Sequence, residues 1–409
     1  VNATALSFVE TSPYSGLAFN GTWTPSVDAE LTSQDIQLYQ DGTCTAVSGA
    51  PVSLGAAATT TTFGGTNGTT YSYRITSTDL AGNSSTSGCS TAIRLDTTPP
   101  VAAASLNWVQ GTYHNNVNVT SSWTPSTSTD KASQSISYYS DAACSTLISG
   151  PTTLGSVSTN TNAFTGVNGS TYYYQITTID QATNTTISAC SNPMTIDTVA
   201  PAAPTITGWT QSTPTASANI NANWNLSVAT DIDFQEITFY SDAACTIATL
   251  GPVTKTNVAV THAYTPGADG SYYYQVRAVD LASNATLSSC SAGLLVDTTA
   301  PVAASTLNWV QTSPFAGTSV DATWTLSPDS NLASQEIAYF TDPTCTTASG
   351  ATIPLSNAVT TNAFAGINGS TYYYRINSID HVGNSTQSAC SAPMRLDTTP
   401  PNAATALAW

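Results

Sequence analysis

A domain-sized internal repeat is the feature that most constrains the fold of this chain. An Asp-Thr-[Thr/Val]-[Pro/Ala]-Pro motif occurs four times, and its aspartates follow one another at intervals of 100 or 101 residues. They are Asp96, Asp197, Asp297 and Asp397. An interval of this length is that of a whole domain, not of a solenoid unit. We therefore predict separate domains, each with its own core.

The repeat divides the chain into residues 1–98, 99–199, 200–299 and 300–399, called repeats 1 to 4 below. Residues 400–409 are expected to be the first strand of a fifth repeat or, alternatively, a donor strand for the sheet edge of another subunit. Because both ends of the chain lie inside the repeating pattern, we expect it to be a window cut from a longer array. The short proline-rich boundaries restrict the backbone, which predicts an extended rod.

Alternating side chains indicate β-strands within each repeat. In residues 71–75 every second side chain falls on the same face, and residues 172–176, 272–276 and 372–376 match that segment. No useful length of sequence shows the 3.6-residue period of a helix. Short strands bounded by turn residues predict an all-β chain of antiparallel sandwiches.

The charge of the chain excludes two classes of partner. Seven Lys and Arg residues face 24 Asp and Glu residues, for a formal net charge of -17. Binding to nucleic acid or to anionic lipid requires clustered basic residues. No apolar stretch is long enough to span a bilayer. We therefore expect no nucleic-acid partner and no membrane insertion of this segment.

Each repeat contains two cysteines, 45 or 46 residues apart. An even count with constant spacing predicts one disulfide per repeat, and hence an oxidising compartment. The predicted pairs are Cys44–Cys89, Cys144–Cys190, Cys245–Cys290 and Cys345–Cys390. Buried free thiols and zinc are the alternatives, but zinc needs four ligands, which no repeat supplies.

Acidic and amide residues recur near the repeat boundaries, where they could hold calcium, which takes six to eight oxygen ligands. Besides the linker aspartates, the candidate ligands are Asp79, Asn83, Asp180, Asn184, Asp280, Asn284, Asp380 and Asn384. The alternative is that an Asp and an Asn four residues apart only close a turn. Further acids, namely Asp28, Asp130, Asp231, Asp233 and Asp329, are interpreted as keeping no common register and are left out of the site.

The order of motifs, W-T-P-S, then N-G-[ST]-T-Y, then D-x-A-G-N-S, resembles fibronectin type III domains and the Ig-like repeats of large bacterial surface adhesins and extracellular fibres. The resemblance implies seven-stranded sandwiches with a core tryptophan and a corner tyrosine. The implied core residues are Trp23, Trp123, Trp224 and Trp324, and the implied corner residues are Tyr71, Tyr172, Tyr272 and Tyr372. It also implies calcium at the joints, where it stiffens such rods. The cysteine pair is foreign to typical fibronectin type III domains.

The sequence favours a structural function. No catalytic motif is present and the three histidines do not recur, so we expect no enzyme. The leading hypothesis is a stalk or fibre segment of a large secreted or cell-surface microbial protein, whose partners are neighbouring repeats of the same chain. One alternative is a set of adhesin repeats that bind glycan or a host protein, with Tyr173, Tyr273 and Tyr373 as candidate contact residues. The other is a filament that assembles from copies of the chain. Frequent Asn-x-Ser/Thr sequons make glycosylation a further hypothesis.

Overall fold

The computed structural model describes residues 1–404. It contains two compact units, one of residues 1–199 with 281–284 and the other of residues 200–280 with those from 285 onward. All regular structure in the described range is β-strand. Within that range, no helix is present that could cross a bilayer.

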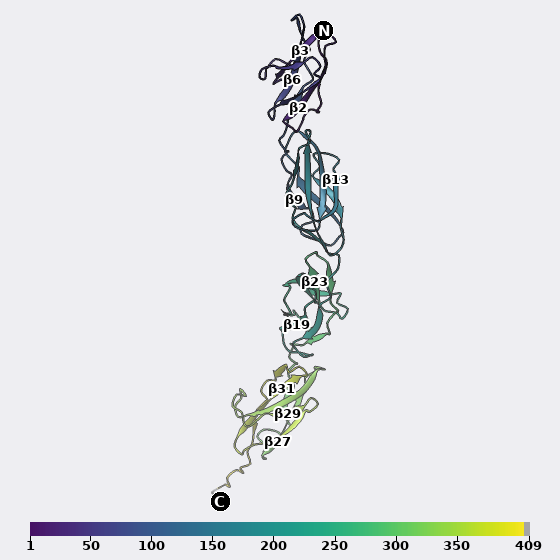
Figure 1. The fold of residues 1–409 in the computed structure, drawn as a ribbon. Coiled ribbons are helices and arrows are strands. Elements are labelled where there is room, and N and C mark those ends of the chain that lie inside the picture. The colour runs from purple at the N-terminus through teal and green to yellow at the C-terminus, as the bar shows by residue number, and fades with distance from the viewer. Residues whose placement is uncertain (405–409) are drawn as a thin grey trace. The chain divides into compact units, whose positions relative to one another are not determined.

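Repeat 1 is a sandwich of two sheets (Figure 1). Its strands are β1 (Thr4–Phe8), β2 (Ala18–Thr24), β3 (Leu31–Tyr39), β4 (Val52–Gly55), β5 (Thr60–Gly64), β6 (Thr70–Asp79), β7 (Ser84–Thr86) and β8 (Ile93–Arg94). One sheet has the order β1-β2-β5 and the other the order β4-β3-β6-β7, with β8 also paired to β6. Because β7 and β8 pair with successive parts of β6, they are two halves of one interrupted last strand.

Repeat 2 has the same two sheets, and its strands also pair only with one another among the described residues. They are β9 (Ala104–Trp108), β10 (Tyr113–His114), β11 (Asn118–Thr124), β12 (Lys131–Tyr139), β13 (Leu147–Thr153), β14 (Thr161–Thr165), β15 (Ser170–Asp180), β16 (Thr185–Ile187) and β17 (Met194–Ile196). The short β10 runs parallel to β17, so the segment after the first strand crosses to the second sheet.

The second unit carries the same topology. The strands of repeat 3 are β18 (Thr205–Trp209), β19 (Ile220–Asn225), β20 (Ile232–Tyr240), β21 (Ala248–Thr256), β22 (Thr261–Tyr264), β23 (Gly270–Asp280), β24 (Ala285–Leu287) and β25 (Leu294–Val296). Those of repeat 4 are β26 (Ser305–Trp309), β27 (Ser319–Thr325), β28 (Leu332–Phe340), β29 (Ile353–Ser356), β30 (Thr361–Ala365), β31 (Thr371–Asp380), β32 (Ser385–Gln387) and β33 (Met394–Arg395).

The prediction of tandem antiparallel β-sandwiches is confirmed. With β7 and β8 counted as one interrupted strand, repeat 1 has the seven strands that the resemblance to fibronectin type III domains implies. Residues 405–409 of the last predicted element, residues 400–409, lie outside the described range, and residues 400–404 form no strand.

The predicted core tryptophans are buried in every repeat. In repeat 1 the indole N–H of Trp23 on β2 donates to Gln34 Oε1 on β3 at 2.8 Å, which links the two sheets. The Gln34 amide then donates to backbone carbonyls beyond β4, including that of Ala58 at 3.0 Å. Repeats 3 and 4 contain the same indole–glutamine bond at 2.9 Å. A buried polar pair of this kind is stable because its hydrogen bonds replace those lost to water.

A second tyrosine of the Tyr-x-Tyr strand connects the sheets at the centre of the core. Tyr73 on β6 is fully buried. Its hydroxyl lies 2.9 Å from the carbonyl of Ser7 on β1 and 2.6 Å from that of Thr22 on β2. Tyr174, Tyr274 and Tyr374 make the equivalent contacts. Burial raises the pKa of the Tyr73 phenol, which therefore keeps its proton and remains a donor.

The implied corner tyrosines bond to the backbone just upstream of their own strand. The Tyr71 hydroxyl accepts from the Thr66 N–H at 3.0 Å. Tyr172 and Tyr372 accept from the equivalent amides. In repeat 3 the bond runs the other way, since Tyr272 donates to the carbonyl of Ala268 at 2.6 Å.

Replacing the four central tyrosines (Tyr73, Tyr174, Tyr274 and Tyr374) by Phe should destabilise every repeat by about 0.5–1.5 kcal/mol, because each change removes the donor of a buried hydrogen bond to the carbonyls of the first two strands. Chemical denaturation of the whole chain measures the effect. The matched control replaces the half-buried neighbours Tyr173, Tyr273 and Tyr373 by Phe, with an expected change below about 0.5 kcal/mol per repeat. Equal losses in the two variants would contradict the cross-sheet role of the central hydroxyls.

Candidate functional site: disulfide loops and joints

The structure contains four disulfides with the predicted pairing: Cys44–Cys89, Cys144–Cys190, Cys245–Cys290 and Cys345–Cys390. Their Cα–Cα distances are 5.8 to 6.0 Å, within the range of ordinary disulfides. In repeat 1, Cys44 follows β3, and Cys89 lies in the gap between β7 and β8. Each disulfide therefore ties the third strand to the last one, on the second sheet.

Two serines keep the sheet intact where the last strand is interrupted. The hydroxyl of Ser87 accepts from the backbone N–H of Ile75 at 2.9 Å, and that of Ser90 accepts from Tyr73 N–H at 3.0 Å. All four repeats have the same pattern, Ser-x-Cys-Ser, and the same two bonds. The serine hydroxyls take the place of backbone carbonyls of a neighbouring strand. The cysteine can therefore leave the sheet while the N–H groups of β6 keep their hydrogen bonds. The recurring Ser-x-Cys-Ser pattern could have identified these serines, which were not predicted, from the sequence.

The other cysteine of each pair lies in a turn held by an aspartate three residues earlier. Cys144 has a left-handed backbone, with φ of 52°, which costs energy for a residue with a side chain. The Asp141 carboxylate stabilises this turn by accepting from Thr146 N–H at 2.6 Å and from the backbone and side chain of Ser145. These bonds lower the pKa of Asp141 to about 2. The recurring Asp-x-x-Cys spacing could have identified this residue from the sequence.

The linker aspartate between repeats 1 and 2 is bound from both sides. The Asp96 N–H donates to the carbonyl of Tyr14 in its own repeat at 2.8 Å. The Asp96 carbonyl accepts from the side-chain amide of Asn184 in the next repeat at 2.7 Å. In the second unit, Asn384 binds the carbonyl of Asp297 in the same way at 2.8 Å. The same type of bond joins Asn284 to the carbonyl of Asp197.

The residues after the linker aspartate are held by an asparagine of the Asn-Gly turn. Asn67 accepts from the N–H of Thr97 at 2.8 Å and donates to the hydroxyl of Thr98 at 2.7 Å. Asn168 and Asn368 bind the equivalent threonine amides. Repeat 3 has Asp269 at this position, and its carboxylate accepts from Thr298 and Thr299. The start of each linker is therefore fixed to the repeat that precedes it.

The predicted Asp–Asn pairs close a turn in repeats 1, 2 and 4. Asn184 donates its backbone N–H to Asp180 Oδ1 and its side-chain amide to Asp180 Oδ2, both at 2.9 Å. The pairs Asp79–Asn83 and Asp380–Asn384 have the same two bonds. Because the amide nitrogen faces the aspartate, this asparagine acts as a donor here. Asp280, the last residue of β23, is also buried. Asp397 N–H donates to the carbonyl of Phe315 in its own repeat.

The structure gives Asp130, which the sequence analysis left out of the site, a defined place beside two predicted ligands. Carboxylate oxygens of Asp96, Asp130 and Asp180 all lie within 4.8 Å of one another. The Gln181 N–H donates to the Asp130 carbonyl at 2.9 Å, which holds this residue next to Asp180. Equivalent backbone bonds occur in two other repeats. The Leu80 N–H donates to the Glu30 carbonyl in repeat 1, and the His381 N–H donates to the Asn331 carbonyl in repeat 4.

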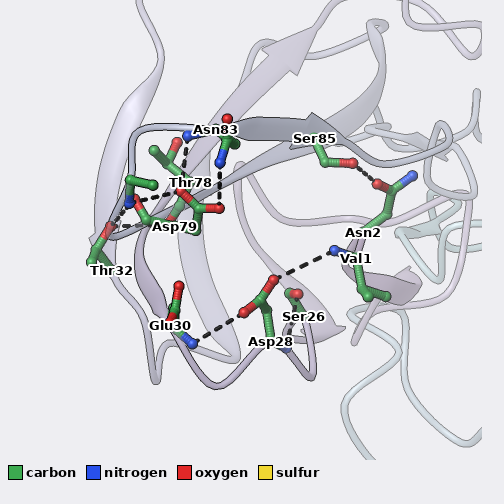
Figure 2. Close-up of polar contacts among 11 residues, drawn as sticks. Val1, Asn2, Ser26, Asp28, Glu30, Thr32, Thr78, Asp79, Asn83 and Ser85 are labelled. Atoms are coloured by element: carbon green, nitrogen blue, oxygen red, sulfur yellow. Dashed lines mark hydrogen bonds and ion pairs between the residues drawn. The ribbon is translucent and has the colours of Figure 1, made fainter.

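A second register contains Asp28 and Asp329, which contact the start of their own repeats. The carboxylate of Asp329 accepts from the N–H of Val302, as the Ser128 hydroxyl accepts from Val101. In repeat 1 the amino group of Val1 lies 3.9 Å from the Asp28 carboxylate (Figure 2). The polar residues after the second strand therefore fall into two registers, two residues apart, that make different contacts.

The end of repeat 1 has a small cavity that is open to solvent, of about 80 Å³, lined in part by Asp28, Ser77 and Asp79. Figure 2 shows Asp28 and Asp79 at this end of the repeat. The Ser77 hydroxyl is buried and has no hydrogen-bond partner among residues 1–404. The equivalent Thr178, two residues before Asp180 on the same face of β15, is also buried and without a partner there.

The tyrosines predicted to contact partners lie on the outer face of the second sheet and are half-buried. Each is directly opposite an aromatic residue of the neighbouring strand: Tyr139 faces Tyr173, Tyr240 faces Tyr273, and Phe340 faces Tyr373. These tyrosines are therefore partly covered by aromatic side chains of the neighbouring strand. Repeat 1 has Ser72 at this position, opposite Tyr39.

Comparison with solved structures finds chains that are similar to this one. The solved FN1–FN3 domains of chicken CNTN1 match with a TM-score of 0.32 and 13% sequence identity, over 72% of this chain and 99% of that one. No protein-family model matches the chain. No curated protein matches it either.

The turn around Asp141 should make repeat 2 sensitive to strong acid. The folded pKa of about 2 lies below the unfolded value of about 3.9. The stabilisation is therefore present above about pH 4 and is lost as pH falls through the folded pKa. We expect Asp141→Asn to lower the thermal midpoint at neutral pH, with the difference from wild type shrinking between about pH 4 and 2. A difference that stays constant over this range would contradict the assignment.

Proposed function

We propose that this chain is a structural spacer, a stalk or fibre segment of a secreted or cell-surface protein. The observation that carries this proposal is the double attachment of the linker. Asp96 is bonded to Tyr14 in its own repeat and to Asn184 in the next. Bonds of this kind limit the freedom of one domain relative to its neighbour, which a spacer requires and a flexible tether does not.

The disulfides support an extracellular location and a load-bearing role. Stable disulfides form in oxidising compartments. In each repeat the disulfide closes a loop of 45 or 46 residues that contains most of the sandwich between the third and the last strand. A loop of this length stabilises a domain by roughly 3–4 kcal/mol in the chain-entropy description. It also limits how far a repeat extends when it is pulled.

We also propose that calcium binds at the joint between repeats 1 and 2, held by Asp96, Asp130 and Asp180. Calcium–oxygen distances of about 2.3–2.6 Å allow two ligands of one ion to be up to about 5 Å apart. The observed limit of 4.8 Å among these carboxylate oxygens fits that geometry. The buried Thr178 hydroxyl without a partner is a further candidate oxygen.

The electrostatics of this cluster favour a cation. The salt bridges within residues 1–404 include none of these three aspartates. At this spacing two like charges repel by on the order of 3 kcal/mol at the effective dielectric constant of a protein surface. A bound divalent cation would offset that repulsion and tie the linker aspartate to repeat 2. Calcium would thus have a structural role, as a crosslink between the linker and repeat 2, and no catalytic role.

Single-molecule pulling of the chain should give four similar unfolding events if the repeats act as spacers. Under reducing conditions each event should lengthen by the residues of the disulfide loop, 45 in repeat 1, which is roughly 150 Å of extended chain. The oxidised chain is the control. Unfolding lengths that are the same with and without reductant would contradict the load-bearing role. Saturable binding of a glycan by every repeat would favour the adhesin alternative.

Calcium should stabilise the chain by mass action, by about 2.7 kcal/mol at a hundredfold excess over the dissociation constant. We therefore expect a chelator to lower the thermal unfolding midpoint of repeats 1 and 2. Added calcium should restore that midpoint. Sodium chloride at equal ionic strength is the control for screening. A midpoint that is the same with chelator and with calcium would contradict the site.

A further inference from the structure

We infer that the residue at the position of Asp130 decides whether a joint needs a cation, and that Asn331 closes the joint between repeats 3 and 4 without one. The inference rests on the calcium site proposed above and deepens it. It predicts that the joints of one array differ in their response to calcium.

Asp130 and Asn331 occupy the same place in their repeats. Each directly precedes the third strand, β12 or β28. The backbone fixes both in the same way, since Gln181 N–H donates to the Asp130 carbonyl at 2.9 Å and His381 N–H to the Asn331 carbonyl at 3.1 Å. The side chains therefore start from matching points beside Asp180 and Asp380.

The chemistry at that place differs between the two joints. Asn331 donates its side-chain amide to Oδ2 of the linker Asp297 at 3.2 Å. Asp130 instead brings a carboxylate within 4.8 Å of those of Asp96 and Asp180. One joint thus contains an N–H donor facing the linker carboxylate, where the other contains a third negative charge. A donor satisfies the linker carboxylate directly, whereas a third carboxylate adds repulsion that a bound cation would offset.

The unpartnered hydroxyls identify the end of the sandwich as a place for a ligand. Thr178 in repeat 2 and Ser378 in repeat 4 are fully buried without hydrogen-bond partners among residues 1–404. In repeat 1 the equivalent Ser77 lines the cavity that also contains Asp28 and Asp79. The hydroxyl is common to these repeats, so the difference between the joints lies in the residue at the Asp130 position.

Reciprocal substitutions in the full chain test the inference, with calcium chloride as the probe and isothermal titration calorimetry as the readout. Asp130→Asn should remove one calcium site from the wild-type count, and Asn331→Asp should add one. The double variant should return to the wild-type count, which shows that both single variants fold. Asp233→Asn, an exposed acid of β20, is the matched charge control and should leave the count unchanged.

The outcomes separate this inference from the calcium proposal. A wild-type chain that binds no calcium overturns the proposed site and the inference with it. Calcium binding that neither Asp130→Asn nor Asn331→Asp alters overturns the inference alone. A gain with Asn331→Asp and a loss with Asp130→Asn support it. A loss with Asn331→Asp contradicts it, because that result would make Asn331 itself a ligand.

Discussion

The rest of each repeat depends on a disulfide that interrupts the last strand of the sandwich. For Cys89 to reach Cys44, the chain must leave the sheet between β7 and β8. The N–H groups of β6 would then lack partners at the centre of the domain, where an unpaired buried amide costs about as much as a lost hydrogen bond. Ser87 and Ser90 supply those partners with their side chains.

Neutral side chains do the polar work in a chain with only 8% charged residues. Serine hydroxyls complete the sheet, a glutamine bonds the core indole, and tyrosine hydroxyls connect the two sheets. Such groups need no counterion, so few Lys and Arg residues are required. Some of the few acids present cluster where a linker contacts the next repeat.

Much of the fold could be predicted from the sequence, because periodicity and cysteine spacing report directly on strands and crosslinks. The central Tyr73, with its two carbonyl contacts, was recognised only as a residue on one face, since its partners are distant in sequence. The joint was predicted in part. Asp96 and Asp180 were identified, but Asp130 was missed because its register shows only when Glu30 and Asn331 are counted as equivalents.

The asparagine of the Asp–Asn turn shows why residue type alone did not settle the joint. An amide offers both an oxygen and an N–H, and a sequence does not say which one faces its neighbour. In the structure the N–H of Asn184 faces both Asp180 and the Asp96 carbonyl. Asn184 therefore holds the linker at Asp96 directly through its own hydrogen bond.

Each repeat depends most on the one crosslink within it. Its most direct test is disulfide mapping of the unreduced chain by mass spectrometry, after digestion at low pH to prevent exchange and with free thiols blocked. We predict four linked peptide pairs, joining Cys44 to Cys89 and the equivalent residues of the other repeats, with no blocked thiol. Blocked free cysteines, or pairs that join different repeats, would contradict it.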